Sequence, residues 1–311
     1  MCSIFENNKS AENITVYLIG ERINQENQDK LKGFAKSYDR KVCIISINNI
    51  ADYIDFDFDT NGWSSIILAR LFLDKLLPQE VDRILYLDGD TLVLEDIGSL
   101  FYSDLGDKVI GMCPEPTVDK SRKEFLALKE HPYHNSGVLL IDLKKCKEEI
   151  GKKVIEFYQF HEGKLFAPDQ DALNGALKEQ IFTLPISFNY FNIYDVYPYK
   201  TLSELSKPTK FMSQEDFNHF RKAPTIIHYL GEERPWRKGN THRFKKEYLH
   251  YLHKTPWKDT PMEEGWQLYF VCFRIFNIVM KPFPMLRYKI INSLIPSFMK
   301  YRKKQLQKNK K

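Results

Sequence analysis

Apolar and polar residues alternate in blocks along the first part of the chain, and the blocks predict strands and helices in turn. Residues 14–20 (ITVYLIG) and 41–47 (KVCIISI) are short apolar runs that predict buried strands. Between them, residues 26–38 place Leu31 and Phe34 on one face of an amphipathic helix. The order strand, helix, strand is typical of a βαβ unit and favours a parallel sheet.

The same reasoning extends the pattern along the chain. It predicts strands at residues 83–88, 135–143 and 225–231, and helices at residues 64–77, 144–161 and 168–179. Ser64 is the expected N-cap of the first of these helices. Between residues 187 and 223 aromatic and polar residues mix without a period, which predicts loop rather than core. We therefore expect an α/β fold with a mostly parallel central sheet.

Composition and charge indicate that the chain carries an extension in addition to this α/β domain. The chain has 311 residues, of which 43% are hydrophobic and 28% charged, so we expect one domain of about 200–250 residues and an extension. The net charge is +5, but residues 281–311 hold ten Lys and Arg and no acidic residue, which leaves 36 basic and 41 acidic residues elsewhere. A basic partner surface is therefore expected in the tail, and the acidic body without a binding motif argues against nucleic acid.

Cysteines and apolar runs indicate the compartment. The five cysteines are widely spaced without a CxxC pair, which argues against a disulfide framework or zinc knuckle and fits a reducing cytosol. No signal peptide is evident at the start. Residues 265–280 are apolar, but Arg274 and Asn277 interrupt them and they fall short of the roughly 20 residues that span a bilayer. We expect a cytoplasmic protein without a transmembrane segment.

Two aspartates follow the apolar strand RILYL in the segment RILYLDGDTLV. Asp88 and Asp90 stand just past the carboxyl end of a predicted strand, where open α/β sheets place their ligands. Residues two apart on an extended segment point to the same side, so both carboxylates can converge. Gly89 between them lets the backbone approach a ligand. A divalent cation would relieve their repulsion; the alternative is that they only cap a turn.

His228, in the apolar strand TIIHYL, is the candidate third ligand. It is followed by Gly231, Arg234 and an aromatic residue in HYLGEERPW. Two carboxylates and one imidazole suit Mn²⁺, with Mg²⁺ as the alternative, and such a site would bridge a diphosphate. The alternative for His228 is a hydrogen-bonded core histidine.

The motifs YLDGDTLV, HNSGVLLIDL, PDQDALN and HYLGEERPW, in this order, resemble the family 8 glycosyltransferases, which include bacterial lipopolysaccharide galactosyl- and glucosyltransferases and, more distantly, glycogenin. The resemblance covers residues 3 to 240. It implies a GT-A fold with a Rossmann-like nucleotide-sugar domain at residues 1–240, and an extension at residues 241–311. It also implies a retaining enzyme that moves galactose or glucose from a UDP-sugar to a cell-surface glycan or lipid-linked acceptor.

The resemblance also assigns roles to single residues. It gives Asp88, Asp90 and His228 as the Mn²⁺ ligands and Asp169, Gln170 and Asp171 as candidates for the catalytic position. Donor-binding residues are then Arg70, Asp88, Gly89, Asp90, Glu115, Asn135, Asp169, Gln170, Gly231 and Arg234. The family usually has lysine where Arg234 stands, and arginine keeps the charge. The alternatives are a surface charge for Arg70, a turn residue for Asn135 and a helix cap for Asp169.

Retention of configuration leaves two routes open. Cleavage of the bond from sugar to diphosphate places negative charge on the leaving oxygen, which the metal, Arg234 and Arg70 would stabilise. Gln170 is a weak nucleophile, and we expect Asp171 to be turned away by the helix, so front-face attack is favoured. A glycosyl adduct on Asp171 or Asp169 is the alternative.

The start of the chain departs from the family. Family members open with a strand and loop that hold the uracil and ribose, and that strand lies between the strands at residues 14–20 and 83–88. We expect the chain as written to lack this strand and therefore to bind donor poorly or to fold poorly. A non-catalytic remnant that binds a sugar nucleotide or a membrane is the alternative function, and a metal-dependent phosphoryl or nucleotidyl transferase is a third.

The tail at residues 281–311 mixes apolar residues with cations. It is expected to attach to an anionic membrane surface on the inner face of the cell membrane, where each basic residue adds about 1 kcal/mol. A disordered terminus is the alternative.

Overall fold

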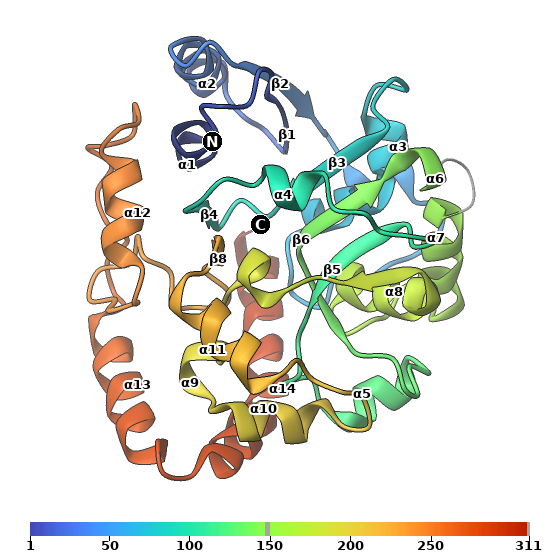
Figure 1. Ribbon diagram of the computed structural model, residues 1–311, viewed down its shortest axis with the longest axis vertical. Helices are drawn as coiled ribbons and strands as arrows, with labels where there is room; N and C mark the ends of the chain where they lie inside the picture. The colour runs from blue at the N-terminus through green and yellow to red at the C-terminus, as the bar shows by residue number, and fades with distance from the viewer. Residues whose placement is uncertain (147–149, 310–311) are drawn as a thin grey trace.

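A computed structural model describes residues 1–146 and 150–309, and Figure 1 shows it as a ribbon. Its strands are β1 Thr15–Gly20, β2 Lys41–Ser46, β3 Arg83–Leu87, β4 Thr91–Val93, β5 Ile110–Pro114, β6 His134–Asp142, β7 Ile181–Thr183 and β8 Ile226–His228. Its α-helices are α1 Cys2–Asn7, α2 Gln25–Lys36, α3 Leu73–Leu76, α4 Gly98–Phe101, α5 Lys120–Phe125, α6 Leu143–Cys146, α7 Ile150–Phe160, α8 Pro168–Leu177, α9 Ile193–Val196, α10 Tyr199–Ser206, α11 Gln214–Lys222, α12 Lys245–Leu252, α13 Gln267–Met280 and α14 Pro284–Asn309. Short 3₁₀ helices run over Ile50–Tyr53, Ser65–Phe72, Lys178–Gln180 and Ile186–Asn189.

The main sheet has the strand order β3-β6-β5-β7. β6 is antiparallel to both β3 and β5, and β7 is parallel to β5, so β3, β5 and β7 share one direction. The expectation of a mostly parallel sheet holds for these strands but not for β6. Because β6 is reversed, its first residues lie beside the end of β3, with Leu87 opposite Val138. The motifs HNSG and DGD therefore meet at one edge of the sheet.

The predicted βαβ unit at the start of the chain is present. β1 and β2 pair in parallel, and the side chain of Asn24 caps α2 by accepting the Asn27 N–H at 2.9 Å. In the part of the chain that the structure describes, β1 and β2 form their own two-stranded sheet and pair with no strand of the main sheet. Among these residues, no strand pairs with the outer edges of β1 and β3, between which the family's first strand was expected to lie. The effect of its absence on donor binding stays a prediction.

β4 and β8 form a short antiparallel pair in which Thr91 lies opposite His228. The strand expected at residues 225–231 is real but ends at His228. Since β4 directly follows the DGD turn, this pairing carries His228 to the two aspartates although 138 positions separate it from Asp90 in the sequence.

The prediction of loop for residues 187–223 is wrong. The segment folds into α9, α10 and α11, and Tyr190, Tyr194 and Phe217 are buried in a core of mostly aromatic side chains. These helices have four to nine residues, too few for an apolar period to emerge, and the aromatic rings bury against residues distant in the sequence. The helix expected at 64–77 is also different, because it is 3₁₀ as far as Phe72 and Ser64 makes no side-chain cap.

Residues after 240 form α12, α13 and α14 rather than a disordered terminus, as far as residue 309. Phe244 lies in the same core as Tyr190, and the inner face of α14 packs on the body through the buried residues Arg287 and Met299. In Figure 1, α13 stands at the edge of the molecule and α14, in red, runs back behind α9–α11. Among the described residues, no helix combines the length and apolarity needed to cross a bilayer.

Candidate active site

The turn between β3 and β4 carries Asp88 and Asp90, and the backbone fixes both. The Asp88 N–H donates to the Gly137 carbonyl of β6 at 2.8 Å, and the Asp90 carbonyl accepts the Tyr229 N–H at 2.9 Å. The Thr91 hydroxyl donates to the Asp88 carbonyl at 2.7 Å. Because the carbonyl closes this turn, the Asp88 carboxylate is not a turn cap and has other partners.

The two oxygens of the Asp88 carboxylate have different neighbours. Oδ1 accepts hydrogen bonds from Arg70 Nη2 at 2.6 Å and from the Tyr86 hydroxyl at 2.9 Å. Oδ2 accepts a longer hydrogen bond from Arg70 Nη1 at 3.4 Å and lies 3.8 Å from His228 Nε2. Arg70 is only 6% exposed and its guanidinium lies over the Tyr86 ring at 4.7 Å, so it is not a surface charge. Arg70 thereby contacts both oxygens, most closely Oδ1, while Oδ2 also faces the histidine.

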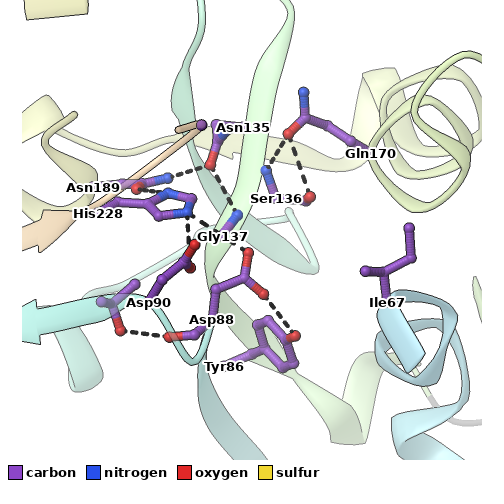
Figure 2. Close-up of polar contacts among 12 residues, drawn as sticks. Ile67, Tyr86, Asp88, Asp90, Asn135, Ser136, Gly137, Gln170, Asn189 and His228 are labelled. Carbon is purple, nitrogen blue, oxygen red and sulfur yellow. Dashed lines mark hydrogen bonds and ion pairs between the residues drawn. The ribbon is translucent and has the colours of Figure 1, made fainter. Parts of the chain in front are cut away.

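The imidazole of His228 is held in one orientation. Its Nδ1 lies 3.0 Å from Asn189 Oδ1, and Asn189 Nδ2 donates to Asn135 Oδ1 at 2.8 Å. An amide oxygen can only accept, which favours the proton on Nδ1 and leaves the Nε2 lone pair directed at Asp90 Oδ1, 3.4 Å away. Figure 2 shows this chain of contacts from Asn135 through Asn189 to the two aspartates.

Gly137 on β6 makes room for this ring. A Cβ atom at position 137 would lie 2.2 Å from His228 Cε1 and 2.5 Å from its Nδ1. Any other residue would therefore displace the imidazole, and the glycine of HNSG is required by packing against His228. At Gly89, by contrast, a Cβ would meet nothing within 4 Å, so packing does not require glycine there.

Asp88, Asp90 and His228 fit a divalent cation. Their ligand atoms all lie within 4.8 Å of one another. Neighbouring ligands of an octahedral ion bound at about 2.1 Å lie about 3 Å apart, so the three groups need to approach only slightly. Two carboxylates and an imidazole oriented by an outer hydrogen bond are a donor set for Mn²⁺ or Mg²⁺. The core-histidine alternative explains the burial of His228 but not the aim of its Nε2.

A basic loop borders this cluster. Arg234 Nη2 lies 3.3 Å from Asp90 Oδ2, and its Nε donates to the Gly231 carbonyl at 2.9 Å. Gly231 has φ +82°, which only glycine adopts easily. Burial would raise the pKa of Asp90; without a bound cation, a doubly protonated His228 would donate to this carboxylate from Nε2, and that contact together with the charge of Arg234 outweighs burial and lowers the pKa. The Asp90 carboxylate is thus ionised beside two cationic or potentially cationic groups.

A second polar cluster joins β6 to the first turn of α8. The Ser136 N–H donates to Gln170 Oε1 at 3.0 Å, and the Ser136 hydroxyl donates to Asp169 Oδ2 at 2.9 Å. Glu115, which follows β5, accepts hydrogen bonds from Asn135 Nδ2 at 2.9 Å and Gln170 Nε2 at 3.0 Å. Asn135 and Asp169 are therefore parts of one network and not merely a turn residue and a helix cap.

Asp169 and Asp171 differ in their surroundings. Asp169 forms an ion pair with Arg70 at 3.1 Å, and burial raises its pKa although this arginine opposes the shift. Asp171 is 1% exposed and accepts hydrogen bonds from Arg122 Nη2 and the Tyr133 hydroxyl, each at 2.6 Å. The helix turns Asp171 away from Asp88, as expected, and both carboxylates are already neutralised by arginine.

The structure thus brings together all the residues expected at the site except Asp171, which among the described residues is linked to the network through the Tyr133 hydroxyl. Sequence reasoning missed the partners Tyr86, Arg122, Tyr133, Ser136, Gly137 and Asn189. Ser136 and Gly137 stand next to Asn135 in HNSG and could have been found from that motif. Asn189 lies in the segment taken for loop and had no signal.

Comparisons with known proteins agree with this arrangement. Residues 1–240 match the model of glycosyl transferase family 8. General stress protein A of Bacillus subtilis (strain 168) is 27% identical over 259 residues, 82% of this chain and 87% of its own length. Lipopolysaccharide 1,2-glucosyltransferase of Escherichia coli (strain K12) is 29% identical over 263 residues, 83% of this chain and 73% of that protein.

The solved structures give the fold. The galactosyltransferase LgtC, in complex with donor and acceptor sugar analogs, superposes with a TM-score of 0.66 at 22% identity, over 86% of this chain and 94% of that one. GlyE of Streptococcus pneumoniae TIGR4 superposes with a TM-score of 0.58 at 23% identity, over 81% of this chain and 56% of that one. The expectation of an α/β fold of the GT-A type is confirmed.

Proposed function

Because this chain belongs to glycosyl transferase family 8, we propose that it is a retaining, metal-dependent enzyme that moves galactose or glucose from a UDP-sugar to a cell-surface glycan or lipid-linked acceptor. One observation carries the proposal: Asp88, Asp90 and His228 converge within 4.8 Å beside Arg234 and the network of Glu115 and Gln170. A metal site, a cation for phosphate and groups for sugar hydroxyls thus lie together. Lipopolysaccharide glucosyltransferases among the relatives support the class of acceptor.

The diphosphate would lie between the aspartates and the loop of Gly231 and Arg234. A divalent cation bound by Asp88, Asp90 and His228 would compensate the negative charge of the departing UDP. Arg234, half-buried over the Trp236 ring at 5.3 Å, can turn from Asp90 to the phosphates. It would then stabilise the same charge as it develops.

Arg70 contributes differently from the expected phosphate contact. Its Nη1 donates to the Ser136 carbonyl at 2.6 Å, and its other groups hold Asp88 and Asp169. With its donors so occupied, Arg70 positions the Asp88 ligand and the sugar-binding residues instead of touching the leaving group.

The sugar would bind against Glu115, Asn135 and Gln170, whose amide and carboxylate groups suit hydroxyls. Front-face attack by the acceptor fits these surroundings, because Asp169 and Asp171 are buried and paired with arginines and are poor nucleophiles. Trapping with a slow donor and intact mass spectrometry tests this. A glycosyl adduct on either aspartate would establish the covalent route.

The activity itself is tested by UDP release. The purified chain is incubated with UDP-glucose or UDP-galactose and Mn²⁺, and UDP and products are followed by mass spectrometry. We expect release that depends on Mn²⁺ and stops with EDTA. Donor binding without release would favour the non-catalytic alternative, and turnover of nucleoside triphosphates without sugar transfer would favour a nucleotidyl transferase.

We also propose peripheral attachment to an anionic membrane on the cytoplasmic side. α13 exposes an apolar stripe at helical spacing: Leu268, Val271, Ile275, Ile278 and Val279 are 56 to 75% exposed. No acidic residue follows Glu264 in the sequence, whereas Lys and Arg are frequent. An exposed apolar face followed by a basic segment without acidic residues suits an interfacial helix.

A further inference from the structure

We propose that α14 forms one wall of the acceptor subsite and that Tyr288 and Asn292 help to select an acceptor ending in a sugar. This inference rests on the proposed transferase function, and it adds specificity residues that lie outside the region matched to the family, residues 1–240.

A pocket of about 350 Å³ separates α14 from the body of the molecule. On the body side it is lined by residues that include Glu115, Asp119, Arg122, Asn192 and Gly231. On the other side α14 contributes Tyr288, Ile291, Asn292, Ile295 and Pro296. The first four of these recur at helical spacing and are half-buried, so one face of α14 is directed at the pocket.

The pocket is continuous with the candidate active site. Glu115 lines it and also accepts hydrogen bonds from Asn135 and Gln170 at 2.9 and 3.0 Å. Gly231 lines it and begins the loop that carries Arg234. A ligand in the pocket would therefore lie next to the residues proposed to hold the donor sugar and the diphosphate, where an attacking hydroxyl has to be.

The lining mixes aromatic, aliphatic and polar side chains, which suits a carbohydrate because a sugar presents both C–H faces and hydroxyls. Aromatic rings of Phe166, Tyr197 and Tyr288 can pack against the C–H faces of a sugar, while Asn192 and Asn292 offer amide groups for hydroxyls. Val118, Ile193 and Ile291 add apolar surface to the same lining, so the pocket offers contacts both for the C–H faces and for the hydroxyls of a sugar. The volume is at the lower end of ordinary ligand pockets, as expected for a sugar end.

The wall made by α14 is fixed near both ends. Near its start, Arg287 is buried, donates to the Tyr197 hydroxyl at 2.8 Å and to Asn277 Oδ1 on α13 at 2.9 and 3.0 Å. Towards its end, Lys303 forms an ion pair with Asp59, and the Arg302 guanidinium lies over the Trp63 ring at 4.6 Å. A helix held in this way keeps its side chains in place, as a specificity surface requires.

Within this wall, Tyr288 and Asn292 stand four positions apart on α14, which places their side chains one turn apart on the same face of the helix. Neither is part of the metal cluster or of the network around Gln170. Their loss should therefore weaken acceptor binding and spare the reaction of the donor with water.

The test compares Tyr288→Ala and Asn292→Ala with Lys289→Ala, an exposed position on the same helix. Two rates are measured with UDP-hexose and Mn²⁺: UDP release without acceptor, and transfer to a panel of p-nitrophenyl α- and β-glucosides and galactosides and lactose. We expect the acceptor KM to rise about tenfold in each pocket variant, as for one lost hydrogen bond or ring contact. Release without acceptor should stay within about twofold of wild type, and Lys289→Ala should match wild type; circular dichroism and melting temperature check folding.

The outcomes separate this inference from the proposed function. No UDP release by the wild-type chain would overturn both. Release together with transfer, but an unchanged acceptor KM in both pocket variants, would overturn only the role of α14. Release by wild type without transfer to any sugar of the panel would overturn the assignment of the pocket to a sugar acceptor.

Discussion

The candidate active-site cluster around Asp88, Asp90 and His228 and the pocket lined by α14 lie side by side but are built differently. In the cluster, the polar groups are buried or half-buried and pair with groups from other parts of the chain, as the Asp88 carboxylate does with Arg70. In the pocket, half-buried side chains project from one face of a single helix toward open space. Groups that are held rigidly by hydrogen bonds and ion pairs suit the stabilisation of charge that develops during a reaction. Side chains on one face of a single helix can be substituted without disturbing those groups, which suits the selection of an acceptor.

The largest effect is expected from Asp90→Asn, which leaves the size of the side chain and removes its charge. We expect UDP release to fall about 10²–10³-fold and Mn²⁺ binding to be lost, because one of the three ligands is weakened. Calorimetry and the UDP assay measure both. The matched control is Asp96→Asn, because Asp96 is an exposed aspartate that follows β4. Equal losses of UDP release and Mn²⁺ binding in both variants would contradict the assignment of Asp90 as a metal ligand.

Gly137→Ala tests whether the cluster depends on close packing. The new Cβ would displace His228, so activity should fall about 10–100-fold and the free energy of unfolding by about 1–3 kcal/mol. The control is Gly33→Ala in α2, where a Cβ meets nothing within 4 Å and a gain of up to about 1 kcal/mol is expected. Normal Mn²⁺ affinity and activity in Gly137→Ala would show that His228 is not held as described.

The pH dependence of the free energy of unfolding tests the burial of His134, the neighbour of Asn135 at the start of β6. His134 begins β6, and burial lowers the pKa of its imidazole from the ordinary 6.5 to about 4. The unfolded chain therefore binds this proton more readily, so stability is fully present above pH 6.5 and is lost as the pH falls toward 4. Between pH 7 and pH 5 the free energy of unfolding should drop by about 2 kcal/mol from this residue.

Urea unfolding of wild type and His134→Gln at both pH values measures this drop. Burial also lowers the pKa of His242 to about 4, so the variant should show a smaller dependence on pH rather than none. An identical dependence in both proteins would mean that His134 is not a neutral buried group.

The smallest effect concerns the outer surface of the C-terminal helices. Ile275→Ser with Ile278→Ser should lower sedimentation with phosphatidylglycerol vesicles about tenfold, because exposed apolar area on α13 is lost. Tyr102→Ser with Phe160→Ser removes comparably exposed rings elsewhere and should not matter. Equal binding by all three proteins, or stronger binding to neutral vesicles, would argue against this surface.

The sequence by itself determined the parts whose signal is local. Short apolar runs identified β1, β2, β3, β6 and β8 but not β4, β5 and β7. Asp88 and Asp90, two apart at the end of β3, indicated converging carboxylates. The motifs HNSG and PDQD were recognised by their resemblance to the family, because each is a continuous stretch of sequence at the start of one strand or one helix. The family resemblance supplied the roles that spacing alone could not.

Only the tertiary structure decided which distant residues meet. The reversed direction of β6, the support of His228 by Asn189 and Gly137, and the pairing of Asp171 with Arg122 depend on contacts between segments far apart in the chain. The short helices of residues 193–222 and the inner face of α14 have aromatic or mixed sequences whose burial is set by their partners. A local period records which side of an element is apolar, but not which other element will cover it.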